Sequence, residues 1–388
     1  MEWPPGTVDL GYISEKDRKV QCIRLQKSIY GNVDAALRFY RTYAEHLIKI
    51  GMQRSKTDAC LFTLRDEKGK VILVTSCHVD DTQIVGHPDK IERFKTQMKE
   101  RFTIKELGQL KKHLGIQYKW IEDNGEIIVE ATLDNLVKEI IDITEVHIGR
   151  PVRNRRAPAK EGSMLEPRTG EELDATPYQK IVGKVMYLTT KLLVECTNAA
   201  RDLSKYFKSP GMEQWEALIY LVGYLKQEQP NLKLTIQTPK EMRFVGLVDA
   251  NYGTDKEERK SISGGLFTVG GSIVSWSLKS QTRTSLSSTE AEYYALSSGC
   301  QELLFVQSLL KDIDELEGPG LLLCDNTSAI QLVKNRQAGL RTKHVDTRHH
   351  FMRDVWKEKR MNIEYIQTEN NESNICMKNL PTRLHCKH

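Results

Sequence analysis

The chain has 388 residues, of which 39% are hydrophobic and 28% are charged. This composition excludes an intrinsically disordered chain, and the length exceeds what one ordinary core needs, so we expect two or three domains. The net charge of +5, with basic and acidic residues interleaved, is compatible with a nucleic-acid partner without establishing one.

Nothing in the sequence predicts export or a membrane span. No apolar stretch is long enough to cross a bilayer, and the acidic, proline-containing start lacks the basic and apolar regions of a signal peptide. The eight cysteines are scattered without CxxC spacing, which favours reduced thiols over a disulfide framework or a zinc site. We therefore expect a soluble protein of the cytoplasm or nucleus.

The N-terminal part of the chain predicts a helix followed by strands. Apolar residues follow helical spacing across 35–50, and a glycine ends the pattern. Two apolar runs come next, at 60–64 and 71–77, and the second run leads into Asp80 and Asp81 before the apolar pattern resumes. This arrangement is typical of strands around a tight acidic turn.

The middle of the chain predicts helices on either side of a linker. A proline followed by an aspartate begins a helix that we expect to span about 88–101. Residues 148–175 contain prolines and are first basic and then acidic, which is typical of a linker. Residues 178–228 have a helical pattern throughout, broken at 209–211, and we expect them to form a helical connection.

The C-terminal part of the chain changes to a mixed pattern from residue 243 onward. Three consecutive strands are followed by a helix over about 288–312 and by a strand that ends at Asp325. This order fits a compact α/β sheet with helices on its faces.

Three acidic residues stand at positions where a two-metal nuclease needs them. Asp249 and Asp325 each end an apolar run, and Glu292 follows the helix cap at 287–289. Any one of them alone would be an ordinary turn or surface acid. Together they favour a converging carboxylate cluster that binds two Mg²⁺ ions, and we choose Glu292 over Glu290 because residues two apart face different sides of a helix.

Ordered motifs link this acidic set to a known family. In the C-terminal part these motifs are Gly246–Ala250, Ser261–Gly264, Ser275–Trp276, Ser287–Tyr293, Cys324–Ile330 and Arg341–Asp346. They resemble the ribonuclease H domain of copia-type LTR retrotransposon polyproteins. The upstream motifs, which resemble the same family's reverse transcriptase, are Lys27–Gly31, Ser55–Phe62, His78–Asp81, Leu107–Leu110 and Leu114–Ile116.

The resemblance implies an α+β multidomain fold. It places a partial reverse transcriptase palm at 1–87, a thumb-like region at 88–150, a linker and helical connection at 151–238, and a ribonuclease H-like α/β domain at 239–388. The implied chemistry is RNA-directed DNA synthesis and Mg²⁺-dependent hydrolysis of RNA in RNA:DNA hybrids, with Mn²⁺ as a substitute ion. The implied partners are the hybrid, an RNA template and DNA; the oligomeric state stays open.

The resemblance also assigns roles to the acids. Asp249, Glu292 and Asp325 would hold two Mg²⁺ ions for hydrolysis, one activating water and the other stabilising the leaving 3′ oxygen. Asp80 and Asp81 match the paired aspartates that hold Mg²⁺ in the polymerase palm, although the family usually has an aromatic residue where this chain has a histidine.

One departure concerns the nuclease. The family's fourth acid, near the C-terminus, aligns with Asn374, which has no negative charge to offset the repulsion between two cations. We therefore expect weakened hydrolysis, which Asn374→Asp should raise.

A basic segment follows the third acid. Arg341, Lys343 and Arg348 are candidates for contacting a nucleic-acid backbone, and a solvated basic surface is the alternative. The histidines within 343–350 do not follow a known metal-ligand spacing, so we favour phosphate or scaffold roles for them.

Two alternatives to a degenerate enzyme remain open. The chain could be a non-catalytic remnant that still binds nucleic acid, which salt-dependent binding of a hybrid without cleavage would indicate. It could also be an unstable pseudogene product, which a cooperative melting transition would exclude.

We predict that this chain alone does not extend a primer. The family's polymerase uses a further aspartate on a strand before the region that begins at Met1, so we expect a 5′-truncated fragment that lacks one metal ligand and the fingers. A primer-extension assay on an RNA template with Mg²⁺ should give no product, and measurable extension by the purified protein would contradict the prediction.

Overall fold

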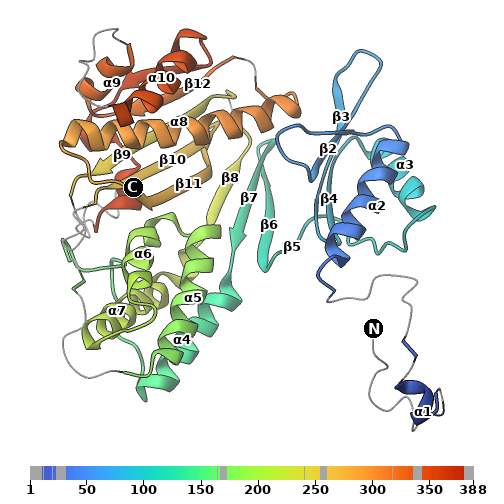
Figure 1. Cartoon of the computed structure of the whole chain (residues 1–388), viewed down its shortest axis with the longest axis horizontal. Coiled ribbons are helices and arrows are strands. Elements are labelled where there is room, and N and C mark those ends of the chain that lie inside the picture. Colours follow the sequence, from blue (N-terminus) through green and yellow to red (C-terminus); the bar gives the residue numbers. More distant parts are fainter. Residues whose placement is uncertain are drawn as a thin grey trace. The chain divides into compact units, whose positions relative to one another are not determined.

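The structure is a computed structural model (Figure 1). It describes residues 11, 13–19, 21–22, 32–163, 165–166, 173–239, 241–253, 260–316, 318–334 and 343–379, with backbone only for 343–349. The fold is α+β and multidomain, and the chain divides into two compact units. One unit comprises residues 1–106 and 312–314, and the other comprises 107–311 and 315–388.

The first unit combines helices with one antiparallel sheet in the order β1-β2-β3-β4. Its helices are α1 (Glu15–Arg18), α2 (Ala35–Lys49) and α3 (Pro88–Lys99). Its strands are β1 (Gln53–Arg54), β2 (Leu61–Arg65), β3 (Val71–His78) and β4 (Asp81–Gly86). The helices predicted at 35–50 and 88–101 and the strands around an acidic turn are confirmed.

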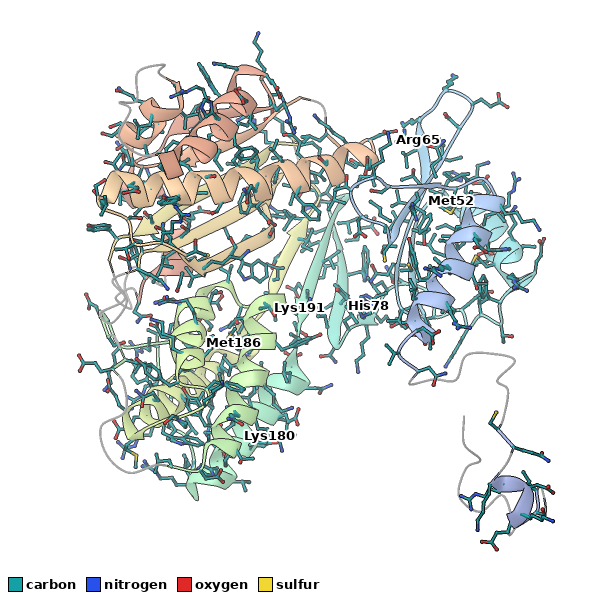
Figure 2. The ribbon with its side chains drawn as sticks, in the orientation of Figure 1. Met52, Arg65, His78, Lys180, Met186 and Lys191 are labelled. Carbon is teal, nitrogen blue, oxygen red and sulfur yellow. The ribbon has the colours of Figure 1, made fainter. Side chains whose placement is uncertain are left out.

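The core of this unit lies between α2, α3 and the sheet. The apolar spacing of α2 buries Tyr43 and Leu47 against Phe62 of β2, and Met52, labelled in Figure 2, is buried in the same cluster. Tyr43 also joins the helix to the far strand through a 3.1 Å hydrogen bond between its hydroxyl and that of Thr82. These contacts hold the β3–β4 hairpin against α2.

The second unit contains two sheets and two groups of helices. Its strands are β5 (Lys112–His113), β6 (Ile116–Asp123), β7 (Glu126–Thr132), β8 (Leu234–Gln237), β9 (Phe244–Asn251), β10 (Ile262–Val269), β11 (Ser272–Ser280), β12 (Gly320–Cys324) and β13 (Met361–Tyr365). Its α-helices are α4 (Asp134–Ile148), α5 (Ala175–Lys191), α6 (Thr197–Lys205), α7 (Met212–Glu228), α8 (Ser288–Asp312), α9 (Thr327–Lys334), α10 (Lys343–Lys357) and α11 (Asn374–Met377). The 3₁₀ turns are η1 (Val194–Cys196), η2 (Gln229–Asn231) and η3 (Thr368–Asn370). No helix in the described ranges is long and apolar enough to cross a membrane.

Helices α4 to α7 pack together against the antiparallel sheet β5-β6-β7-β8 around one large apolar core. The continuous helical pattern predicted for 178–228 is wrong at 192–196, where α5 ends and η1 forms. The break coincides with a change of packing partner. Leu192 and Leu193 are buried in the core of the helices, whereas Val194 is buried in a separate cluster with residues of β10.

The second sheet has the order β11-β10-β9-β12-β13. Strands β9, β10 and β11 are antiparallel neighbours, and β12 and β13 run parallel to β9. Helices α8, α9 and α10 share a core with one face, and Figure 1 shows α8 lying across the sheet. Residues of η1 and α11 pack against β10 in a second apolar cluster. The predicted three strands, helix and returning strand are confirmed.

Helix α8 lies unusually close to the sheet at Gly299. A Cβ atom there would lie 2.3 Å from Cγ1 of Val248 on β9 and 3.6 Å from Cδ1 of Leu322 on β12. Such a separation is well inside van der Waals contact, so only glycine allows this approach. The position is otherwise an ordinary helical one, and the constraint comes from packing.

We predict that Gly299→Ala destabilises the protein by about 1–3 kcal/mol, because the added methyl group overpacks the core between α8 and β9. Gly183 is the matched control, since it also lies inside a helix but a methyl group added there would have no atom within 4 Å. Gly183→Ala should stabilise by about 0.5–1 kcal/mol. Urea denaturation followed by circular dichroism measures the stability of both variants. Equal stabilities of Gly299→Ala and Gly183→Ala would contradict the close approach of α8 to β9.

Candidate active site

The register of the second sheet places two of the predicted acids side by side. Cys324, the last residue of β12, is the parallel partner of Val248 on β9; Asp325 directly follows β12, and Asp249 is the next residue of β9. Asp249 is 3% exposed and Asp325 is half-buried. The sheet therefore presents two carboxylates together at one edge.

The third acid comes from the start of α8. Ser287 Oγ accepts a hydrogen bond from the backbone N–H of Glu290 at 3.2 Å, and the Glu290 carboxylate accepts one from the N–H of Leu286 at 2.7 Å. These two bonds satisfy backbone N–H groups around the start of the helix. Glu290 is thereby used as a cap, and Glu292 faces inward with 8% of its surface exposed.

The carboxylates of Glu292 and Asp325 and the thiol of Cys324 each place one atom within 4.8 Å of the others. The sulfur is a poor candidate ligand for a hard cation, because burial raises the pKa of the Cys324 thiol and Sγ accepts a 3.4 Å hydrogen bond from Asn326 N–H. Asp249 is not in that set, but the strand register and its charge effect on Glu292 place it nearby, so the carboxylate oxygens of Asp249, Glu292 and Asp325 are the candidate donors.

Burial dominates the electrostatics of this cluster. It raises the pKa of Glu292 to about 9, and the charges of Asp249 and Asp325 contribute to that rise. Burial also raises the pKa of Asp249, an effect that Lys378 opposes and Asp325 reinforces. Glu292 Oε2 is buried and accepts no hydrogen bond, and the buried Asp249 Oδ2 has the ammonium group of Lys378 beside it. A buried carboxylate oxygen without a partner destabilises a folded chain unless a cation or proton compensates it.

Lys378 is a further residue of the site, and no motif in the sequence pointed to it. Its Nζ lies 2.9 Å from Asp249 Oδ2, as an ion pair without hydrogen-bond geometry, and donates a 2.5 Å hydrogen bond to Asn374 Oδ1. The segment that carries both residues packs tightly on β10, since a Cβ at Gly264 would lie 2.3 Å from Met377. Gly264 is the cross-strand partner of Asp249. In the sequence, the spacing of four residues between Asn374 and Lys378 was the signal that could have indicated their contact.

Asn374 lies at this site with both ends of its amide engaged. The amide nitrogen donates to the backbone carbonyls of Thr368 at 3.0 Å and Asn371 at 2.8 Å, and the amide oxygen accepts from Lys378. A carboxylate in the same rotamer would place an oxygen against two carbonyl oxygens. An acid at this position would therefore need a local rearrangement before it could act as a ligand.

Asp80 and Asp81 lie in the first unit, at the tip of the β3–β4 hairpin. His78, labelled in Figure 2, ends β3 and pairs with Asp81 across the turn. Both aspartates are exposed, and Val79 between them and the strand has a φ of 56°. The predicted tight acidic turn is thus present.

The predicted nucleic-acid contacts cannot be placed. Arg341 lies outside the described residues, and the side chains of Lys343 and Arg348 do as well, although their backbone belongs to α10. Their role stays a prediction.

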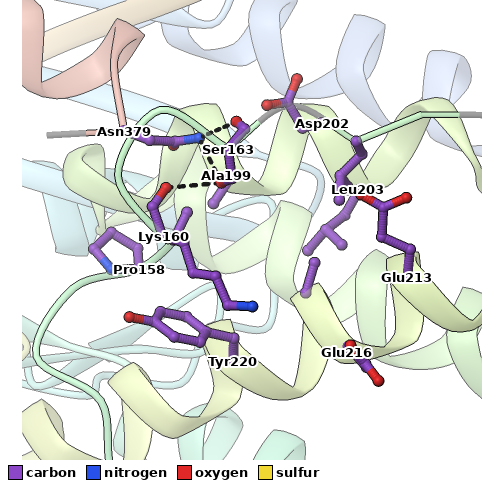
Figure 3. Close-up of a pocket in the computed structure, with 13 residues that line it drawn as sticks. Pro158, Lys160, Ser163, Ala199, Asp202, Leu203, Glu213, Glu216, Tyr220 and Asn379 are labelled. Carbon is purple, nitrogen blue, oxygen red and sulfur yellow. Dashed lines mark hydrogen bonds between the residues drawn. The ribbon is translucent and has the colours of Figure 1, made fainter.

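A small pocket of about 100 Å³ lies elsewhere in the second unit, between α6, α7 and the segment before α5 (Figure 3). Lys160 and Tyr220 line one side, and the side-chain nitrogen of Asn379 donates to the carbonyl oxygen of Ser163 at 3.0 Å. None of the predicted site residues lines it. The pocket and the carboxylate cluster are therefore separate features.

Residues 4–150 match the family model described as reverse transcriptase (RNA-dependent DNA polymerase). The whole chain is similar to Pol polyproteins of transposons. It is 27% identical to that of transposon TNT 1-94 from Nicotiana tabacum, over 98% of this chain and 28% of the relative. It is 29% identical to that of transposon RE2 from Arabidopsis thaliana, over 95% of this chain and 24% of the relative.

Among solved structures, the foamy viral protease-reverse transcriptase in complex with RNA/DNA hybrid aligns with 91% of this chain and 40% of its own, at 13% identity and a TM-score of 0.46. The family assignment rests on the sequence matches. This chain spans about a quarter of the length of these curated relatives.

We predict that the metal-free protein loses stability as pH rises from 4.5 toward 9. The folded-state pKa of Glu292 is raised from 4.5 to about 9, so the folded chain binds more protons than the unfolded chain in this range. The stabilisation is complete below pH 4.5 and is lost as pH passes the folded pKa. Thermal melts in EDTA across this range measure the slope.

Glu292→Gln should reduce this slope, because the substituted side chain does not ionise. Glu126→Gln, an exposed position at the start of β7, is the control and should keep the slope of the parent chain. Identical slopes for all three proteins would contradict the prediction.

Proposed function

The chain belongs to the Pol polyproteins of retrotransposons, and on that premise we propose that its region 239–388 is a ribonuclease H that hydrolyses RNA in RNA:DNA hybrids with Mg²⁺. The observation that carries this proposal is the cluster of Asp249, Glu292 and Asp325, which three separate elements bring to one sheet edge. The domain limits at 87, 150 and 238 are part of the same proposal.

The residues present fit a divalent cation. Glu292 buries a carboxylate oxygen that accepts no hydrogen bond, which is the environment a cation would compensate, whereas the buried Asp249 Oδ2 already lies 2.9 Å from the ammonium group of Lys378. The available donors are carboxylate oxygens, and these favour Mg²⁺ or Mn²⁺ over softer metals. Asp249, Glu292 and Asp325 would hold the ion.

The chain's own residues prepare the site in three ways. The adjacent strands hold Asp249 and Asp325 next to each other, and the capped start of α8 aims Glu292 at them. A bound divalent cation supplies a Lewis acid that lowers the pKa of water and stabilises charge on phosphate oxygens. Burial excludes water from the carboxylates and so strengthens their attraction for that cation.

For the first unit we propose a part of a reverse transcriptase, with Asp80 and Asp81 as Mg²⁺ ligands. The reverse transcriptase match over residues 4–150 and the exposed hairpin tip support this role. RNA template and DNA would be further partners, and recognition of the hybrid would run through its shape and 2′-hydroxyls. We place the protein in the cytoplasm or nucleus, which the free thiols of the seven described cysteines support.

A second candidate is a nucleic-acid-binding remnant without cleavage. The engaged amide of Asn374 favours it, because the place of the fourth acid offers no free ligand atom. Such a chain would bind a hybrid in a salt-dependent manner and leave the RNA strand intact.

We predict Mg²⁺- or Mn²⁺-dependent cleavage of the RNA strand in a uniform RNA:DNA hybrid. Asp249→Asn should reduce the rate at least ~100-fold, because outer partners of metal ligands already contribute ~10–100-fold and Asp249 would be a direct ligand. A gel assay with labelled RNA measures the rate.

Asp142→Asn is the matched control, since Asp142 is exposed on α4 and should leave cleavage unchanged. An unchanged cleavage rate in Asp249→Asn would contradict the assignment of this site. Binding without cleavage in the parent chain would select the non-catalytic remnant.

A further inference from the structure

The carboxylate cluster already contains a cation of its own. The ammonium group of Lys378 lies 2.9 Å from Asp249 Oδ2, and Asp249 is the most deeply buried of the three acids. The same ammonium group donates to Asn374 Oδ1 at 2.5 Å. It therefore links Asp249 on β9 to Asn374, the residue aligned with the family's fourth acid.

The fold holds this ammonium group in place. Met377, the neighbour of Lys378, is buried against Gly264, and the backbone N–H of Lys378 donates to the Asn374 carbonyl at 3.0 Å. Asn374 is itself anchored by two hydrogen bonds from its amide nitrogen. The lysine side chain is only 35% exposed. The Lys378 side chain is therefore held by its partners, unlike the side chain of a fully exposed lysine.

Charge balance then limits how many metal ions the site can take. With all three carboxylates ionised, as metal binding requires, three carboxylates and one ammonium leave two negative charges, which a single divalent cation neutralises. A second divalent cation would lie among the same oxygens as the ammonium group and be repelled by it. Asn374 adds no charge to offset that repulsion.

We propose that the ammonium group of Lys378 takes the place of one of two divalent cations, so that Asp249, Glu292 and Asp325 hold a single divalent cation. The inference deepens the proposed function, because it rests on these carboxylates binding metal. Lys378 is thereby a positioning residue that holds Asp249 in place through the 2.9 Å ion pair.

The test is Mn²⁺ binding to the full chain without nucleic acid, measured by calorimetry and electron paramagnetic resonance. The parent chain should bind one ion and show the spectrum of an isolated Mn²⁺. Lys378→Met should bind two ions, whose spectrum shows coupling between neighbours about 4 Å apart. Lys378→Arg should keep the stoichiometry at one because it retains the charge.

Lys184→Met is the matched control. Lys184 is partly buried in the same unit and forms a 2.9 Å ion pair with Glu139, so its removal tests the loss of a lysine away from the carboxylates. It should leave the stoichiometry at one. Melting curves confirm that each variant is folded.

Two coupled Mn²⁺ ions in the parent chain, or one ion in folded Lys378→Met, would overturn the inference. Either result is independent of whether the chain cleaves an RNA:DNA hybrid. A chain that binds one Mn²⁺ and cleaves no hybrid keeps the inference and loses the activity. A chain that cleaves the hybrid and binds two keeps the activity and loses the inference.

Discussion

The candidate site depends on compensating the repulsion between carboxylates at one end of the sheet. Asp249 and Glu292 are taken out of water, the charges of Asp249 and Asp325 raise the pKa of Glu292, and that of Asp325 also raises the pKa of Asp249. A folded chain tolerates such a cluster when a cation compensates it. The cluster has no evident role in packing, which makes it the strongest indication of function in the second unit.

Two close approaches of backbone fix where this cluster forms. On one face of the sheet Gly299 lets α8 lie against Val248, the residue before Asp249. On the other face Gly264, the cross-strand partner of Asp249, lets Met377 seat the segment that carries Lys378. Strand β9 and its neighbour β10 are therefore packed from opposite faces near Asp249. The packing of the sheet therefore fixes where the carboxylates lie.

The segment after β13 decides what kind of site this is. Asn374 donates to two carbonyl oxygens and accepts from Lys378, so the pair forms a complete hydrogen-bonded unit. A carboxylate could not satisfy the same partners. The local structure thus fits an amide at this position, with a lysine supplying positive charge beside Asp249.

The sequence by itself determined most elements of the second sheet and its three acids. Helix caps, apolar runs that end in aspartate and glycine turns are local signals, and they identified α8, β9 and β12 together with Asp249, Glu292 and Asp325. The tertiary structure alone decided three other things: the break at 192–196, the contact of Lys378 with Asp249 and the engagement of the Asn374 amide. Each of these depends on how the chain packs in three dimensions, because Val194 is buried under β10 and Lys378 reaches a strand more than a hundred residues earlier. Local periodicity carries no information about such contacts, which arise only when separate elements compete for the same buried space.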